Sequence, residues 1–397
     1  MAIKRWILSE AGKGSEKPDF SLSAAELGLA GQDFHVRLTR LRGGLQEGVE
    51  CVEIDNGRFS FVVLPTRGMS IWKGWLGKRG AKGSVEIGWQ SPVEGPVHPH
   101  FVSVAEPGGL GFLDGFDEWF VRCGLESNGA PDFDEHGTLK YTLHGRIANL
   151  PASRVELTFD DEKKELALTG IVDETRFHFH KLRLQATIST RLGEPGLRVH
   201  DEVINLAATP ATAQMLYHIN FGPPLLEAGS KIVAPIAQLV PRTPHAAKTV
   251  ATWDTFKGPE PGFDEEVYLT QLVAGADQRT EVLLENAAKS LGASVNYDQK
   301  TLPYFILWKD TRALSDGYVM GMEPSTNYPN PRTYETKQDR VVKLGAGEKV
   351  AFDLAITIHG DRQSVAAAEK RIATIAGATT PHVARAPQKG WSIEGEE

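Results

Sequence analysis

Two segments of the chain carry polar side chains in a pattern suited to proton transfer. Residues 215–222 read MLYHINFG, and as a strand they would place His218 and Asn220 on one face, opposite apolar residues. Residues 320–327 read MGMEPSTN, so Glu323 would close an apolar strand beside a loop that begins with proline. A carboxylate at a strand end and an imidazole on a polar strand face can serve as general base and general acid near neutral pH.

Two glycine-containing loops offer further groups that could bind a ligand. Arg67 lies in PTRGMSI, where the end of a strand next to glycine would let the arginine reach into a cleft. A surface arginine in a turn explains the same pattern. His144, Gly145 and Arg146 are consecutive, and the glycine would let the backbone come close to a ligand. A lone loop histidine with a purely structural role is the alternative.

The segment LDGFDEWFVRCGLESNG interleaves charged and aromatic residues. Aromatic faces could cover the C–H groups of a sugar ring while Asp114, Arg122 and Asn128 bind its hydroxyls. A solvated loop with aromatic anchors would have the same composition. If Arg67, Arg122 and Arg146 converged, they could also form an anion site for a phosphosugar.

A metal site is a further hypothesis for the histidines of the segment RFHFHK. His178 and His180 would share one strand face and, with His218 or Glu323 as a third ligand, could hold a divalent metal ion. Two strand histidines among charged neighbours are the simpler interpretation. The chain has no CxxC, HExxH, phosphate-loop or nucleophile-elbow motif, so we expect neither a metal nor a cofactor.

Composition argues against several classes of protein. The 397 residues carry a formal net charge of −8, which disfavours nucleic acid as the main partner. The longest stretch without Asp, Glu, Lys or Arg, residues 203–226, contains prolines and polar residues, so we expect no membrane span. Residues 1–17 contain no signal-peptide core, and two cysteines fit a reducing compartment. We therefore expect a cytoplasmic protein.

The elements that must position these residues are mostly strands. With 40 glycines and 23 prolines the chain is rich in turns, and no alternation of strands with helices is present. Alternating or apolar runs predict strands at 155–159, 166–170, 182–188, 197–203, 301–308, 318–322, 340–344 and 350–358. We predict an all-β protein with large antiparallel sheets and few short helices. Its expected domains are an N-terminal extension packed on the core (1–45), a carbohydrate-active sandwich (46–360), and a C-terminal part (361–397) with a helix at 364–376 followed by a flexible tail.

The segments PTRGMSI, DGFDEWFVRCGLESNGAP, LHGRIANLPA, LYHINFGPPLL and GMEPSTN, in this order, resemble the aldose 1-epimerase (galactose mutarotase) superfamily, and most closely a bacterial branch known as a domain of unknown function. The resemblance implies a β-supersandwich with a sugar in its concave cleft. It also implies that Glu323 takes the proton of the anomeric hydroxyl and that His218 protonates the ring oxygen. His144 would bind the sugar near the anomeric centre, and Arg67 would bind its hydroxyls.

Three functions are compatible with these residues. The first is an aldose 1-epimerase that interconverts the anomers of a free sugar or sugar derivative. The second is another sugar-converting enzyme, such as an isomerase, epimerase or lyase, with possible metal assistance from His178 and His180. The third is a non-catalytic sugar-binding protein. The segment HGRIANLPA lacks the residues usual after this histidine in mutarotases, and residues 104–135 form a distinct insertion, so the sugar itself stays open.

Overall fold

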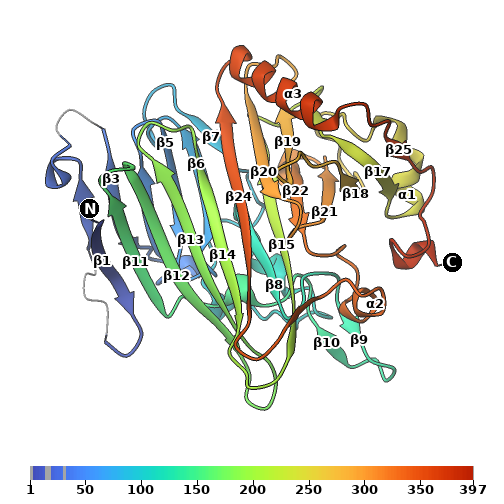
Figure 1. Ribbon diagram of the computed structural model, residues 1–397, viewed down its shortest axis with the longest axis horizontal. Coiled ribbons are helices and arrows are strands. Elements are labelled where there is room, and N and C mark those ends of the chain that lie inside the picture. Colours follow the sequence, from blue (N-terminus) through green and yellow to red (C-terminus); the bar gives the residue numbers. More distant parts are fainter. Residues whose placement is uncertain (1–2, 14–18, 30–32, 397) are drawn as a thin grey trace.

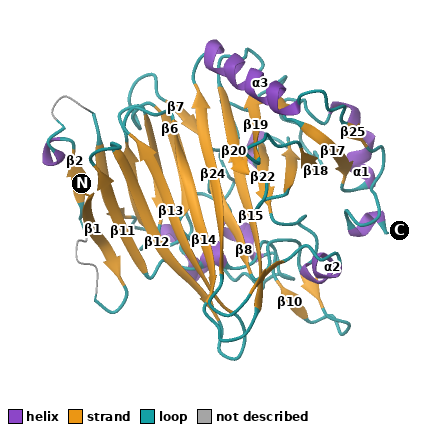
Figure 2. Cartoon of the chain, viewed as in Figure 1, coloured by secondary structure: helices purple, strands orange, loops and turns teal. Residues whose placement is uncertain are grey.

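The computed structural model describes residues 3–13, 19–29 and 33–396, and its strands form two large sheets and one small hairpin (Figures 1 and 2). The nine-stranded sheet has the order β1 (Ile3–Glu10), β11 (Arg154–Asp160), β12 (Glu165–Thr175), β13 (Lys181–Arg191), β14 (Gly196–Asn205), β24 (Lys349–His359), β20 (Gly292–Asp298), β19 (Arg279–Glu285) and β16 (Lys231–Val233). Each strand runs antiparallel to its neighbours, as the sequence predicted.

The fourteen-stranded sheet carries the candidate site. Its order is β2 (Ser21–Ser23), β3 (His35–Arg40), β4 (Glu50–Asp55), β5 (Phe59–Leu64), β6 (Ser70–Leu76), β8 (Phe120–Leu125), β15 (Ala211–Phe221), β22 (Val319–Ser325), β21 (Tyr304–Asp310), β18 (Glu266–Leu272), β17 (Ile236–Pro241) and β25 (His382–Val383), with β7 (Val85–Ile87) paired to β6 and β23 (Val342–Leu344) paired to β15. A small hairpin joins β9 (Asp132–Phe133) and β10 (Leu139–Tyr141). The α-helices are α1 (Pro244–Lys248), α2 (Arg332–Lys337) and α3 (Arg362–Ala376).

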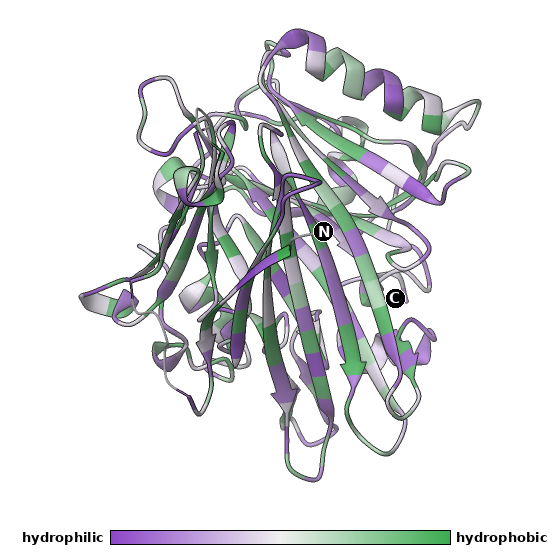
Figure 3. Cartoon of the chain, turned by 60° about the vertical axis from the view of Figure 1, so that its left-hand side comes forward, coloured by the Kyte–Doolittle hydropathy of each residue, from purple (hydrophilic) through white to green (hydrophobic). Residues whose placement is uncertain are grey.

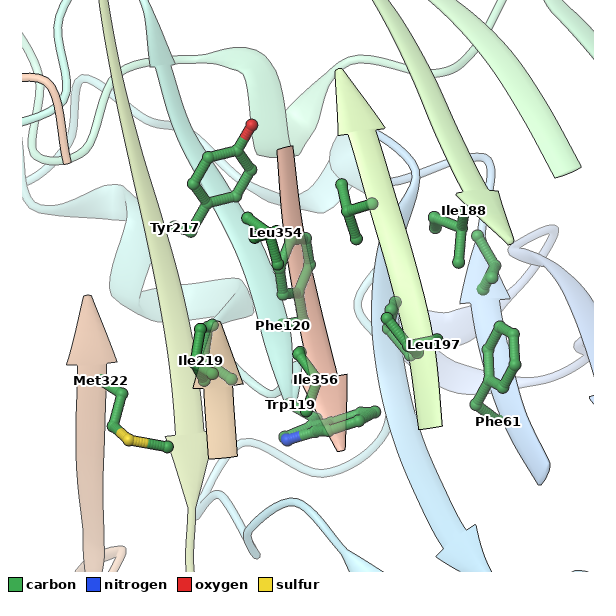
Figure 4. Packing of buried hydrophobic residues seen from close by; sticks show 14 of the residues in the cluster. Phe61, Trp119, Phe120, Ile188, Leu197, Tyr217, Ile219, Met322, Leu354 and Ile356 are labelled. Atoms are coloured by element: carbon green, nitrogen blue, oxygen red, sulfur yellow. The ribbon is translucent and has the colours of Figure 1, made fainter. Parts of the chain in front are cut away.

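Alternation of apolar and polar residues explains the nine-stranded sheet. In β12 and β13 buried side chains alternate with partly exposed ones, because successive side chains of a strand point to opposite faces. The same alternation is visible as green and purple bands along the long strands in Figure 3. The apolar face of this sheet packs on the fourteen-stranded sheet, where Tyr217 and Ile219 of β15 lie near Leu354 and Ile356 of β24 (Figure 4).

The centre of the fourteen-stranded sheet is buried on both faces. Every residue of β5, β8 and β22 is buried, because irregular segments between the strands fold over the face that the other sheet does not cover. Phe112 and Phe116 of one such segment pack with Val121 of β8 and Leu216 of β15 on that face. A long insertion thus encloses part of an otherwise open sheet.

The ends of the chain complete both sheets. The residues expected to form an N-terminal extension contribute β1 to one sheet, and β2 and β3 to the other. Helix α3 lies across the top of β19 and β20 in Figure 1, with Val365, Ala368 and Ile372 packed against Leu283 of β19. The tail expected to be flexible instead forms β25 against β17. In the described part of the chain, no helix combines the length and the apolar character needed to cross a membrane.

Candidate active site

A cavity of about 270 Å³ opens on the covered face of the fourteen-stranded sheet. Its wall combines aromatic side chains with a few titratable or charged ones, namely Phe112, Phe116, Trp308, His144, His218, Arg242, Glu265 and Glu323. The three residues predicted to be catalytic, Glu323, His218 and His144, therefore line the same cavity. An apolar wall with few polar groups is typical of small-molecule sites.

His218 and Glu323 come from neighbouring strands. Because Ile219 of β15 pairs with Met322 of β22, His218 lies opposite Glu323 in the antiparallel register. The Nε2 atom of His218 is 3.3 Å from Oε1 of Glu323, and both side chains are more than nine-tenths buried. Gly321 leaves the room for this contact, since a Cβ atom there would lie 2.8 Å from the same carboxylate oxygen.

Asn220 fixes the orientation of the His218 ring. Its Nδ2 atom donates to the carbonyl oxygen of Glu118 at 2.9 Å, so its Oδ1 atom is left as an acceptor. That oxygen lies 2.6 Å from Nδ1 of His218, which must then be the protonated ring nitrogen. In the neutral ring, Nε2 consequently presents a lone pair to Glu323.

Burial shifts the proton equilibria of this pair in opposite directions. It raises the pKa of Glu323 well above its usual value, and the nearby carboxylate of Glu265 acts in the same direction. It lowers the pKa of His218 to about 3, with a further contribution from His144. Near neutral pH the pair therefore holds one proton between the carboxylate and Nε2. A pair in this state can donate a proton from one member and accept one at the other.

His144 lines the cavity beside His218. Its backbone is left-handed, with φ 56°, and its Nδ1 atom donates to the carbonyl oxygen of Asn128 at 2.9 Å. The side-chain amides of Asn128 and Asn327 exchange two hydrogen bonds, which hold that segment in place. Burial lowers the pKa of His144 to about 4, so Nε2 is an acceptor at neutral pH. The rings of His144 and His218 are 5.4 Å apart between centroids.

Arg67 does not contact the cavity, and the expectation that it binds sugar hydroxyls is wrong. Its side chain is fully buried, with Nε 2.5 Å from Glu118 Oε1 and Nη2 donating to the carbonyl oxygen of Gly115. The insertion covers this strand end, so the arginine holds the insertion instead of a ligand. Because Glu118 also supplies the carbonyl that anchors Asn220, Arg67 indirectly supports His218.

Arg122 also lies away from the cavity, which corrects its predicted role in binding. It forms a two-pronged ion pair with Asp201 of β14, and neither side chain is exposed. Arg122 belongs to β8, so this pair links the two sheets across the core. The alternation of β8 places its side chain on the inner face, together with Tyr217, which also donates to Asp201.

Asp114 and Arg146 are exposed and do not line the cavity. Asp114 borders a separate open groove, which shares Leu113 with the cavity. Since Arg67 and Arg122 are buried in different places, the predicted convergence of three arginines does not occur. Asn128 and Asn220 act through His144 and His218 rather than by facing the cavity.

Two charged residues of the cavity were missed by sequence reasoning. Arg242 directly follows β17 and is half-buried; among the described residues it forms no ion pair, and its Nε atom has no hydrogen-bond partner. Glu265 directly precedes β18 and accepts a hydrogen bond from Nε1 of Trp308 at 2.7 Å. Arg242 follows Pro241 at a strand end, the same kind of signal that drew attention to Arg67.

The two histidines of the predicted metal site are separated. They lie in the turn between β12 and β13, not on a strand face; His178 is exposed with φ 66°, whereas His180 is largely buried. Neither lines the cavity with His218 and Glu323. The predicted site with a ligand from that pair is therefore wrong.

Comparison with known proteins places the chain in a family. Residues 46–358 match the family described as Domain of unknown function (DUF4432). The chain belongs to the DUF4432 family. A candidate aldose 1-epimerase from Klebsiella pneumoniae subsp. pneumoniae MGH 78578, known from its crystal structure, is 36% identical to this DUF4432 protein. That match covers 97% of this chain and 99% of the other, with a TM-score of 0.92. A search of curated proteins gives no match.

More distant structures show the fold of this DUF4432 protein. A galactose mutarotase-like protein from Clostridium acetobutylicum is 15% identical over 82% of this chain and 98% of its own, with a TM-score of 0.55. A galactose 1-epimerase from Lactobacillus acidophilus NCFM is 12% identical over 81% and 98%, with a TM-score of 0.53. The galactose mutarotase-like fold and the family expected from the sequence are thus confirmed. All five polar cavity residues lie inside the span that matches DUF4432.

Proposed function

We propose that this protein is a sugar-converting enzyme of the aldose 1-epimerase type, which interconverts the anomers of a free sugar or sugar derivative. The observation that carries the proposal is the contact of His218 Nε2 with Glu323 Oε1 inside an apolar cavity. Ring opening needs one group to accept a proton while another donates one, and the reverse transfer closes the ring. A single proton held between a carboxylate and an imidazole meets both needs.

The reaction begins from the form in which Nε2 of His218 carries the shared proton and Glu323 is ionised. Glu323 then takes the proton of the anomeric hydroxyl, while His218 gives its proton to the ring oxygen. The C1–O5 bond breaks, and the anomeric carbon becomes an aldehyde. Rotation about C1–C2 exposes the other face of the carbonyl. The reverse proton transfers then re-form the ring as the other anomer, with no net change in protons or electrons.

The remaining cavity residues would bind and orient the sugar. His144 presents Nε2 as an acceptor for a hydroxyl near the anomeric carbon. Phe116 and Trp308 flank His218, with ring centroids 5.1 and 5.2 Å from it, and their faces suit the C–H groups of a sugar ring. The unpaired guanidinium of Arg242 would donate to sugar oxygens, and its charge would favour a substrate with an acidic substituent.

Saturation-transfer NMR of anomeric exchange tests the proposal. Aldoses, deoxysugars and sugar acids would be compared with wild type, Glu323→Gln and His218→Asn. We expect faster exchange with wild type on at least one sugar, and a loss of about 10²–10⁴-fold in either variant. If Arg242→Gln loses turnover of sugar acids but keeps turnover of the other sugars, Arg242 binds the acidic substituent of the substrate.

Two exposed residues provide matched controls. Glu135→Gln and His136→Asn make the same substitutions on side chains that are 86% and 79% exposed, and both should leave exchange unchanged. If a sugar binds without faster exchange in wild type, the mutarotase assignment fails. New product signals would then favour another sugar conversion, and their absence a binding protein.

A further inference from the structure

A second cluster of titratable side chains lies outside the cavity, where the two sheets meet. Glu126 directly follows β8, Glu174 lies near the end of β12, and His180 ends the turn that leads to β13. One nitrogen or carboxylate oxygen from each residue lies within 4.8 Å of the other two. Strand β8 belongs to the fourteen-stranded sheet and β12 to the nine-stranded one, so the cluster bridges them.

The imidazole of His180 lacks a hydrogen-bond partner although it is buried. Its side chain is 8% exposed, and neither ring nitrogen forms a hydrogen bond. Nδ1 nevertheless lies 3.0 Å from Glu126 Oε1, and Nε2 lies 3.5 Å from Glu174 Oε1. Ligand bonds of about 2.0–2.2 Å place neighbouring ligand atoms of one metal ion about 3.0–3.5 Å apart. The separation of Nδ1 from Glu126 Oε1 fits two ligands of one ion. A shared ion would bind one ring nitrogen and one oxygen of each carboxylate, and one such atom from each residue lies within 4.8 Å of the other two.

Glu174 is held with its carboxylate directed at the cluster. Its two oxygens accept hydrogen bonds from the backbone N–H groups of Leu125 and Glu126, each at 3.0 Å. Its side chain is only 2% exposed. Backbone donors of this kind orient a ligating carboxylate and leave further lone pairs free.

We propose that Glu126, Glu174 and His180 bind a divalent transition-metal ion. One imidazole nitrogen and two carboxylate oxygens suit Zn²⁺ or Mn²⁺, whereas Ca²⁺ and Mg²⁺ favour sites made of oxygen alone. The ion would tie the end of β8 to the hairpin of β12 and β13. The segment that follows β8 includes Asn128, whose carbonyl orients His144. The site thus stabilises the fold next to the cavity without taking part in proton transfer.

Calorimetric titration of the full chain with ZnCl₂ and MnCl₂, after removal of metal with EDTA, tests the proposal. We compare wild type with His180→Asn and with His178→Asn, which makes the same change two residues away on an exposed side chain. We expect one equivalent to bind to wild type and His178→Asn, and at least 100-fold weaker binding to His180→Asn. The bound ion should raise the Tm of the first two proteins only.

The proposal is overturned if wild type binds neither ion stoichiometrically, or if His180→Asn binds as tightly as wild type. Should His180→Asn fail to fold, Glu126→Gln provides the same test, because the Glu126 side chain is 30% exposed and tolerates the change more readily. Binding and Tm are measured without any sugar. Failure of the metal proposal is therefore distinct from failure of the proposed catalytic function.

Discussion

The side-chain amide of Asn220 determines which nitrogen of His218 faces Glu323, and this can be tested at a single atom. In Asn220→Asp, a carboxylate replaces the amide next to Nδ1 of His218, while the donor to Glu118 is lost. The added charge stabilises the imidazolium and raises the pKa of His218. We expect kcat/KM to fall about 10- to 100-fold at pH 7, because the proton balance with Glu323 changes.

The pH profile separates this positioning role from a merely structural one. If Asn220 sets the protonation of His218, the acidic limb of kcat/KM should move to higher pH in Asn220→Asp. Anomeric exchange measured by NMR between pH 4 and 8 would detect the shift. An unchanged profile with a uniformly lower rate would mean that the substitution only disturbs packing.

At this scale the sequence predicts residues on regular strands better than residues at strand ends. The alternation of residues 215–222 indicated that His218 and Asn220 share a face, and the pleat alone ensures it. The interpretation of Arg67 failed because nothing near a strand end reveals that a distant insertion will cover it. Arg242 carries a similar local signal, yet only the packing of β17 beside β18 places it in the cavity.

At the scale of elements, the position of the loop that carries His144 depends on a close contact between its backbone and that of Gly124 and Ser127. A Cβ atom at Gly145 would lie 2.0 Å from the carbonyl oxygen of Ser127 and 2.4 Å from that of Gly124, and φ is +72°. In Gly145→Ala the loop must therefore move away from the segment that orients His144. We expect a loss of about 10²-fold in kcat/KM, the scale of a misplaced catalytic group.

Gly137→Ala is the matched control for this change. Gly137 has nearly the same backbone conformation, with φ +75°, but nothing lies within 4 Å of a Cβ atom there. We expect left-handed backbone strain to lower the unfolding free energy of both variants by about 1–2 kcal/mol, which urea unfolding would measure. Only Gly145→Ala should lose activity. Equal activity in the two variants would contradict the role assigned to the loop.

The long elements of the fold could be predicted because they are exposed to solvent on one face. Strands β12, β13 and β14 alternate clearly, so their positions and pairing order follow from the sequence. Strands β5 and β8 are buried on both faces, and their apolar runs say little about which face holds the site. That information lies in the insertion, whose course depends on tertiary contacts such as the pair Arg67–Glu118.

For the whole molecule, the buried histidines of the cavity couple stability to pH. Burial lowers the pKa of His144 to about 4 and that of His218 to about 3, against 6.5 in the unfolded chain. Below pH 6.5 the unfolded chain therefore binds protons that the folded protein does not. Their contribution to stability is complete above pH 6.5 and is lost as the pH falls toward 3. The contribution of Glu323 has the opposite sign. Because burial raises its pKa, its contribution to stability is complete at low pH and is lost as the pH rises toward the pKa of the folded state.

Removing one of these histidines should weaken the acid dependence of stability. His359, whose pKa is also lowered by burial to about 4, contributes equally to wild type and to His218→Asn, so the difference between the two proteins isolates His218. Between pH 7.5 and 4.5 wild type should lose on the order of 3 kcal/mol more unfolding free energy than the variant, from about 1.4 kcal/mol for each pH unit below 6.5. Urea unfolding at both pH values measures this difference, with the exposed His136→Asn as control. Parallel losses in all three proteins would mean that His218 is protonated in the folded state, and the pair with Glu323 would then be an ion pair at rest.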